Sequence, residues 1–164
     1  MRITLLSDTH GYLDEGIYRH LEWGEEVWHA GDFGPGVSEA LEQLGRPVRG
    51  VWGNIDPISL RQRHPVELEF ETGGARVWMT HIGGYPGHYA ARIKARLQAV
   101  RPALFVCGHS HILRVMPDPA LGLLHLNPGA AGRHGFHPVR TLLRFQLEEG
   151  RVRDLQVVEL GKRG

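Results

Sequence analysis

The hydrophobic positions in the first half of the chain form short continuous runs, separated by segments in which they recur every three to four residues. Continuous runs bounded by turn residues indicate buried strands, and the second pattern indicates amphipathic helices. The pattern predicts strands over residues 2–7, 25–30 and 47–52 and helices over residues 13–21 and 37–44. Strands and helices that alternate in this way favour parallel strands joined by right-handed crossovers.

The second half of the chain has a different pattern. Residues 57–64 are polar and are expected to form a loop. The elements predicted beyond it are a hairpin over 66–71 and 76–80, a helix over 88–100, a buried strand over 103–107, and shorter, mostly antiparallel strands over 112–116, 121–126, 141–147 and 152–158. No repeat, low-complexity tract or linker interrupts the chain, so we expect a single domain over residues 1–164.

The composition is that of an ordinary globular protein, with 41% hydrophobic residues, 23% charged residues and a net charge of +1. So small a charge argues against extended nucleic-acid binding through a basic surface. The single cysteine, Cys107, excludes an internal disulfide framework and a cysteine zinc cage. No leader precedes the first predicted strand and no apolar run approaches the ~18 residues of a membrane span, so we expect a cytoplasmic protein without a membrane partner.

Side chains that can bind metals follow the predicted strands at the points where the strands end. After the strand over residues 103–107 come His109 and His111, and alternate residues of an extended segment point to the same side. The other strand-end residues of this kind are Asp8, His10, Asp32, Asn54 and His81. Because ligand sites in parallel α/β sheets form outside the carboxyl ends of strands, we expect these seven side chains to converge.

Two carboxylates, four imidazoles and one amide exceed the three protein ligands that one catalytic zinc needs. The surplus predicts two metal ions about 3.5–4 Å apart that share one carboxylate. Two divalent ions contribute about +4, and two carboxylates with a bridging hydroxide remove about 3, which leaves roughly +1. That charge suits a phosphodiester, and the metals would lower the pKa of a bound water so that hydroxide attacks phosphorus.

The strand-end residues resemble the D-x-H, G-D, G-N, H and G-H-x-H blocks of the calcineurin-like metallophosphoesterases, in particular those of the small prokaryotic phosphodiesterase subgroup. The matching segments, in the same order, are Asp8–Thr9–His10, Gly31–Asp32, Gly53–Asn54, His81 and Gly108–His109–Ser110–His111. Asn127–Pro128–Gly129 resembles a further loop of that subgroup. The resemblance implies a four-layer α/β fold in which two mixed β-sheets pack face to face with flanking helices.

The resemblance also implies a role for each of these residues. The first metal would be held by Asp8, His10 and His111, the second by Asn54, His81 and His109, and Asp32 would bridge the two. Manganese is the expected metal, with iron, nickel, cobalt and zinc as alternatives. The expected catalytic residues are Asn54, His81, Asp32 and Asp56. Asp56 is expected to accept a hydrogen bond from an imidazole that binds metal.

One position departs from the resemblance. Many phosphatases of the family have a histidine after the G-N pair, where it acts as general acid or orients the substrate, but this chain has Ile55. The small subgroup also often lacks that histidine. The resemblance therefore names no residue that would protonate the leaving group. The candidates in this chain are His88 and His134.

The other aromatic and basic residues are interpreted mainly as structural. The residues expected to be structural are His20, His29, His64 and His125, and those expected in the core are Trp28, Trp52 and Trp78. Arg61 and Arg63 are interpreted as part of a solvated loop rather than as a phosphate clamp. Two questions stay open: whether His134 and His137 line a pocket, and whether Tyr85 and Tyr89 stack on a base or pack within a loop.

The sequence-based hypothesis is a dinuclear-metal-dependent phosphoesterase that hydrolyses small phosphodiesters by attack of a metal-bridging hydroxide. A phosphomonoesterase on the same metals remains open. A non-catalytic scaffold is the third alternative, because the retromer scaffold subunit has this fold and binds partner proteins. A scaffold should have lost some of the metal ligands, and none is missing here. We also expect a homodimer, because small members of the family often pair.

Overall fold

The computed structural model of the protein describes all residues from 1 to 164. The strands are β1 (Arg2–Leu6), β2 (Glu26–His29), β3 (Val48–Gly50), β4 (Glu67–Thr72), β5 (Ala75–Thr80), β6 (Leu104–Val106), β7 (Leu113–Asp118), β8 (Leu123–Pro128), β9 (Val139–Glu148) and β10 (Arg151–Lys162). The helices are α1 (Glu15–Trp23), α2 (Val37–Glu42), α3 (Ile58–Arg63) and α4 (Ala91–Val100). None of these helices has both the length and the apolar character needed to cross a membrane.

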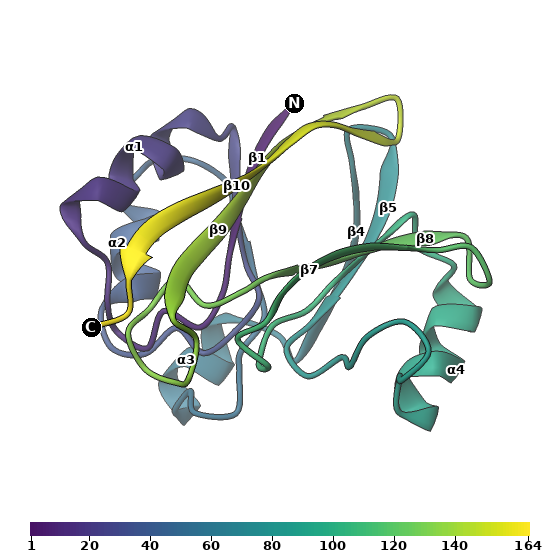
Figure 1. Ribbon diagram of the computed structural model, residues 1–164, viewed down its shortest axis with the longest axis horizontal. Coiled ribbons are helices and arrows are strands. Elements are labelled where there is room, and N and C mark those ends of the chain that lie inside the picture. The colour runs from purple at the N-terminus through teal and green to yellow at the C-terminus, as the bar shows by residue number, and fades with distance from the viewer.

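The strands form two five-stranded mixed sheets that face each other (Figure 1). The first has the order β10-β9-β1-β2-β3, in which β1, β2 and β3 are parallel and β9 and β10 run antiparallel. The second has the order β4-β5-β6-β8-β7, with β5, β6 and β8 parallel and an antiparallel strand at each edge. The predicted fold of two mixed sheets with flanking helices is confirmed.

Alternate residues of the central strands face different layers. Leu5 of β1 lies in the core between the sheets, whereas Leu6 packs in a second core with residues of α1 and α2. In β5, Val77 and Met79 face the core between the sheets, and Trp78 packs against α4. Burial on both faces explains why these strands appear in the sequence as continuous apolar runs. The layers are therefore helix, sheet, sheet and helix, with α1 and α2 on one outer face and α4 on the other (Figure 1).

The expectation of a loop over residues 57–64 was wrong, because most of this segment forms α3. The helix buries a single residue, Leu60, so it has no apolar periodicity that the sequence could reveal. Arg63 forms ion pairs with Glu39 and Glu42 of α2, which leaves it no role as a phosphate clamp.

Trp52 was wrongly placed in a core strand. The strand β3 ends at Gly50, and Trp52 is half-buried, with the guanidinium of Arg61 lying 4.1 Å from its ring centroid. Trp28 and Trp78 are fully buried, as predicted. The other differences concern element ends: α4 begins at Ala91 rather than at residue 88, and β10 continues beyond residue 158.

Candidate metal centre

The seven strand-end residues predicted to bind metal come together where the carboxyl ends of the two sheets meet. They follow five different strands: Asp8 and His10 follow β1, Asp32 follows β2, Asn54 follows β3, His81 follows β5, and His109 and His111 follow β6. Six of them form two groups, each with its ligand atoms within 4.8 Å of one another: Asp8, His10 and His111, and Asp32, His81 and His109. The Oδ1 atom of Asn54 completes the second group, at 3.0 Å from His81 Nε2 and 2.9 Å from His109 Nδ1.

Asp32 lies between the two groups. Its Oδ1 atom accepts a hydrogen bond from the backbone N–H of Ile55 at 3.0 Å. Its Oδ2 atom is 3.5 Å from His10 Nε2, in the first group, and 3.3 Å from His81 Nε2, in the second. One carboxylate oxygen therefore faces an imidazole from each group, which is the arrangement that a bridging ligand requires.

The carboxylate of Asp8 is oriented in the same way. Its Oδ2 atom accepts hydrogen bonds from the hydroxyl of Ser7 at 2.6 Å and from the backbone N–H of His109 at 3.1 Å. Its Oδ1 atom makes no hydrogen bond and lies 3.1 Å from Nε2 of His111. Ser7 is a supporting residue that sequence reasoning missed, although its position directly before Asp8 was a signal.

The carbonyl of Ala30 fixes the orientation of His81. The Nδ1–H group of His81 donates to this carbonyl at 2.7 Å, so in the neutral ring Nε2 is the nitrogen without a proton, and it faces Asn54 and Asp32. A backbone carbonyl that orients the ring of a ligand histidine is a common supporting contact in metal sites. No sequence signal could have identified Ala30, because any residue supplies a carbonyl.

Five of the seven predicted ligands have a backbone in the left-handed region, where residues other than glycine are disfavoured. The φ angles are 53° for Asp8, 45° for His10, 58° for Asp32, 68° for His109 and 60° for His111. Only three other non-glycine residues have positive φ, namely Arg101, Glu149 and Asp154. Backbone strain of this kind concentrates at functional sites, because the surrounding structure must enforce it.

The close approach of the backbone at Gly53 to Asp32 explains why the G-N block contains a glycine. A Cβ atom on Gly53 would collide with the carboxylate and the backbone nitrogen of Asp32. Only glycine allows the chain after β3 to pass this close to Asp32 and bring Asn54 to the centre.

Burial and the carboxylates act against each other in setting the pKa values of the centre. Burial lowers the pKa of His81, but the carboxylates of Asp32 and Asp8 outweigh burial and leave the pKa raised. Burial raises the pKa of Asp32, but the hydrogen bonds and charges of His81, Ile55 and His10 outweigh it and leave the pKa lowered. At His10 and His109 burial outweighs the carboxylates, so the pKa of each imidazole is lowered.

The donor atoms of the centre fit divalent metal ions. Asp8 Oδ1 and His10 Nε2 are buried and have no hydrogen-bond partner. Asp8 and Asp32 are 0% and 2% exposed, and their only ion-pair partners are histidines. Buried carboxylates without a fixed cation are costly, and carboxylate oxygens with imidazole nitrogens are ligands that divalent metals accept. Two groups of such atoms can hold two ions.

Comparison with known proteins gives the family. A family model of the calcineurin-like phosphoesterase superfamily domain matches residues 1–150. The chain belongs to this superfamily. Its members are in general phosphoester hydrolases and typically bind divalent metals. No curated protein sequence matches the chain significantly.

Solved structures share the superfamily fold with this chain over its whole length. Protein TM1076 of Thermotoga maritima is 25% identical, with a TM-score of 0.70 over 97% of this chain and 99% of that chain. An archaeal phosphodiesterase is 20% identical, with a TM-score of 0.70 over 98% and 100%. Vps29 of Entamoeba histolytica complexed with Zn²⁺ is 19% identical, with a TM-score of 0.73 over 97% and 99%.

The contacts of Asp56 differ from the expectation raised by the superfamily resemblance. Its carboxylate accepts hydrogen bonds from the backbone N–H groups of Phe33, Gly34 and Gly53, at 3.2, 3.1 and 2.9 Å. No imidazole contacts it, so the expectation that it orients a ligand histidine was wrong. Asp56 instead ties the loop after β2 to the loop after β3, which keeps Asp32 and Asn54 side by side.

His29 and His125, which were interpreted as structural, are fully buried and belong to neither ligand group. Burial holds the pKa of His29 well below its ordinary value, and its Nδ1 atom accepts from the N–H of Gly31. Burial also lowers the pKa of His125 to about 4, and its Nδ1 atom lies 3.2 Å from the hydroxyl of Tyr89. Tyr89 is therefore packed in the fold. Burial raises the pKa of the Cys107 thiol to about 12, which makes this cysteine unreactive.

A groove of about 830 Å³ opens beside the metal centre, and Asp32, Asn54 and three ligand histidines form one wall of it. His134 and His137 also line this groove, and the ring of His134 lies 4.8 Å from that of His10. His88 lines neither this groove nor the smaller cavity next to it, and its ring packs on Tyr85. Of the two candidate proton donors, only His134 is placed to reach a substrate at the centre.

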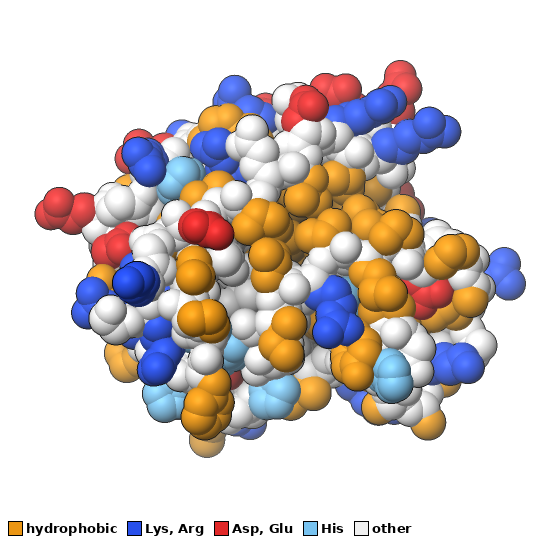
Figure 2. Space-filling view, in the orientation of Figure 1, with side chains coloured by type: hydrophobic (Ala, Val, Ile, Leu, Met, Phe, Trp, Pro, Cys, Tyr) orange, Lys and Arg blue, Asp and Glu red, His pale blue; other side chains and the backbone are white.

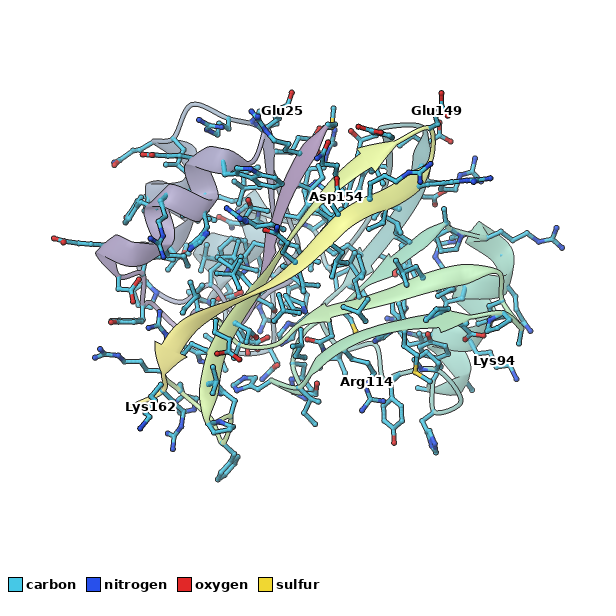
Figure 3. The ribbon with its side chains drawn as sticks, turned by 45° about the horizontal axis from the view of Figure 1, so that its top comes forward. Glu25, Lys94, Arg114, Glu149, Asp154 and Lys162 are labelled. Carbon is cyan, nitrogen blue, oxygen red and sulfur yellow. The ribbon has the colours of Figure 1, made fainter.

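A smaller cavity of about 230 Å³ lies on the other side of His109. Arg114 of β7 is the one Lys or Arg residue that lines this cavity, and its guanidinium lies 4.0 Å from the ring centroid of Tyr85. In Figure 3 the side chain of Arg114 projects outward from β7, away from β9 and β10. Sequence reasoning missed this residue, because nothing near it in the sequence marks it as part of a cavity.

Proposed function

We propose that this protein hydrolyses small phosphodiesters with two divalent metal ions, most simply manganese. The observation that carries the proposal is that one oxygen of Asp32 faces an imidazole of each ligand group. The first ion is assigned to Asp8, His10 and His111, the second to Asn54, His81 and His109, with Asp32 shared. Such a pair of ions lowers the pKa of bound water and stabilises charge on the phosphoryl oxygens.

Other residues of the chain orient the predicted ligands and supply a candidate proton donor. Hydrolysis adds one water across one P–O ester bond and yields a phosphomonoester and an alcohol, which takes up a proton. Ala30 and Ile55 hold His81 and Asp32 in fixed orientations through backbone hydrogen bonds. Side chains held in this way contribute to catalysis because they need no rearrangement as charge develops. His134, on the groove wall, is positioned to donate to the departing oxygen.

A diester suits the site better than a monoester because of the charge around it. The groove is lined by no Lys or Arg, so a second negative charge on phosphorus would have no cation besides the metals. Ile55 occupies the position where many phosphatases of the superfamily have a histidine, which removes another group that could contact a dianion. A monoanionic phosphodiester needs neither a further cation nor that histidine.

The proposal is tested by comparing hydrolysis of bis-p-nitrophenyl phosphate and p-nitrophenyl phosphate, with manganese and after chelation. We expect metal-dependent turnover of the diester that disappears in Asp32→Ala and in Asn54→Ala. Asp154→Ala, which alters an exposed aspartate of β10, is the matched control and should keep turnover. A clear preference for the monoester would replace the diesterase with a phosphomonoesterase. Absence of turnover in protein that binds two metal ions would favour the non-catalytic scaffold.

A further inference from the structure

The groove beside the metal centre has an apolar wall as well as the predicted ligands. This wall is formed by Ile55, Ile112, Leu113, Phe136 and Val139. The exposed fraction of the residue is 45% for Ile55, 55% for Ile112 and 101% for Phe136. Large apolar side chains that gather in a concave surface beside a reactive centre are typical of a ligand site. In Figure 2 hydrophobic side chains spread over the middle of the face that carries β7 and β10.

The groove also lacks positive charge. Apart from Asp32 and the histidines, its only charged lining residue is Glu159 of β10, which forms no ion pair. Of the two lysines of the chain, Lys94 lies on the opposite side of the molecule (Figure 3), and Lys162, the strand partner of Val139, is not among the residues that line the groove. Arg114 belongs to the smaller cavity on the other side of His109 and is absent from the groove lining.

From these two observations we infer that the groove binds one ester arm of the substrate and selects an apolar arm without negative charge, such as an alkyl chain. The inference rests on the proposed phosphodiesterase function and names the class of its substrate. The phosphodiester group lies at the metal centre, and the arm extends over Ile55 toward Ile112 and Phe136. The volume of about 830 Å³ is ample for such a chain.

An arm that carries a carboxylate or a further phosphate is selected against. Such a group would enter the groove beside Glu159, and no Lys or Arg lines the groove to compensate its charge. An alkyl arm instead covers apolar side chains that otherwise face water, and each methylene that is fully buried tightens binding about 4-fold.

The test measures binding of alkyl(methyl)phosphinates, with the alkyl chain from methyl to octyl, to the manganese-loaded protein by titration calorimetry. Such a phosphinate carries one negative charge, as a phosphodiester does, and has no ester bond to hydrolyse, so the measurement is independent of turnover. We expect the affinity to rise about 2- to 4-fold per methylene over the first several carbons. A terminal carboxylate on the hexyl chain should weaken binding at least ~10-fold relative to hexyl(methyl)phosphinate, and Glu159→Gln should recover part of that loss.

Variants separate the groove from nonspecific binding of the alkyl chain. Ile112→Ala and Phe136→Ala should flatten the dependence on chain length without changing the affinity for dimethylphosphinate. Ile58→Ala is the matched control, because Ile58 is 73% exposed and lies outside the groove. Binding of dimethylphosphinate with no dependence on chain length, or equal flattening by Ile58→Ala, would overturn the inference and leave the proposed function standing. Failure of dimethylphosphinate to bind at all would overturn both.

Discussion

The backbone N–H of Ile55 donates to Oδ1 of Asp32 at 3.0 Å, and this contact decides which oxygen of Asp32 faces the metal centre. The remaining oxygen is directed at His10 and His81. A residue that departs from the superfamily pattern in its side chain therefore still serves the centre through its backbone.

Asp32→Asn tests this relationship, because it keeps the shape of the side chain and removes its charge. We expect the protein to bind fewer than two metal ions per chain. Diester turnover should fall by more than the ~10–100-fold that loss of a supporting residue typically costs. Metal analysis after gel filtration and the bis-p-nitrophenyl phosphate assay measure the two effects. Retention of two ions with normal turnover would contradict the bridging role.

Asp56→Asn should show the opposite behaviour, although Asp56 is also a buried aspartate. Its carboxylate accepts three backbone N–H groups, and an amide would turn an N–H₂ toward at least one of them. We expect the free energy of unfolding to fall by about 2–4 kcal/mol, measured by urea denaturation. The folded variant should still bind two metal ions. Unchanged stability with lost metal would restore the role that the sequence suggested for Asp56.

His134→Ala should slow hydrolysis in a way that depends on the leaving group. A poor leaving group such as an alkoxide needs a donor, so we expect turnover of alkyl diesters to fall by about 10²-fold. The p-nitrophenolate group leaves without a proton, so bis-p-nitrophenyl phosphate should be affected much less. His88→Ala is the control and should keep both rates, because His88 lines neither cavity. Equal losses for both leaving groups would argue against a donor role.

His125 should make the fold sensitive to acid. Burial, with the charge of Arg114, outweighs Asp118 and lowers its pKa from the ordinary 6.5 to about 4. Between these values the unfolded chain binds the proton more readily than the folded chain, so stability is present above pH 6.5 and is lost as the pH falls toward 4. The total loss from this group is about 3 kcal/mol.

Urea unfolding of the metal-free protein at several pH values measures this effect. In His125→Gln the free energy of unfolding should fall less steeply between pH 6.5 and 4, by up to ~1.4 kcal/mol per pH unit. The exposed His88→Gln serves as the control and should keep the slope of the original protein. An unchanged slope in His125→Gln would show that this imidazole takes up a proton as readily in the folded protein as in the unfolded chain.

The sequence predicted the layers of the fold because burial leaves a periodic signal. Strands such as β1 and β5 are covered on both faces and therefore contain unbroken apolar runs. The helix α3 buries only Leu60, so its sequence resembles a polar loop. The error at Trp52 has a different cause, which is that an apolar run continues past Gly50, where β3 ends.

The candidate metal centre was predictable because its side chains follow strands that end at a common edge. Contacts made through the backbone were not predictable, because every residue has a backbone carbonyl and nearly every residue an N–H. Nothing in the sequence therefore singled out the carbonyl of Ala30 or the N–H of Ile55. Asp56 illustrates the limit of resemblance: its position matches the superfamily block, but its partners are peptide groups rather than an imidazole.

The left-handed backbone of Asp8, Asp32, His109 and two further predicted ligands lowers the stability of the fold in the absence of a ligand. At such positions glycine would relieve strain on the order of 1 kcal/mol or more per residue. The chain therefore folds around a centre that costs it stability. A ligand that binds the folded state there would offset that cost, so binding and folding are coupled at this centre.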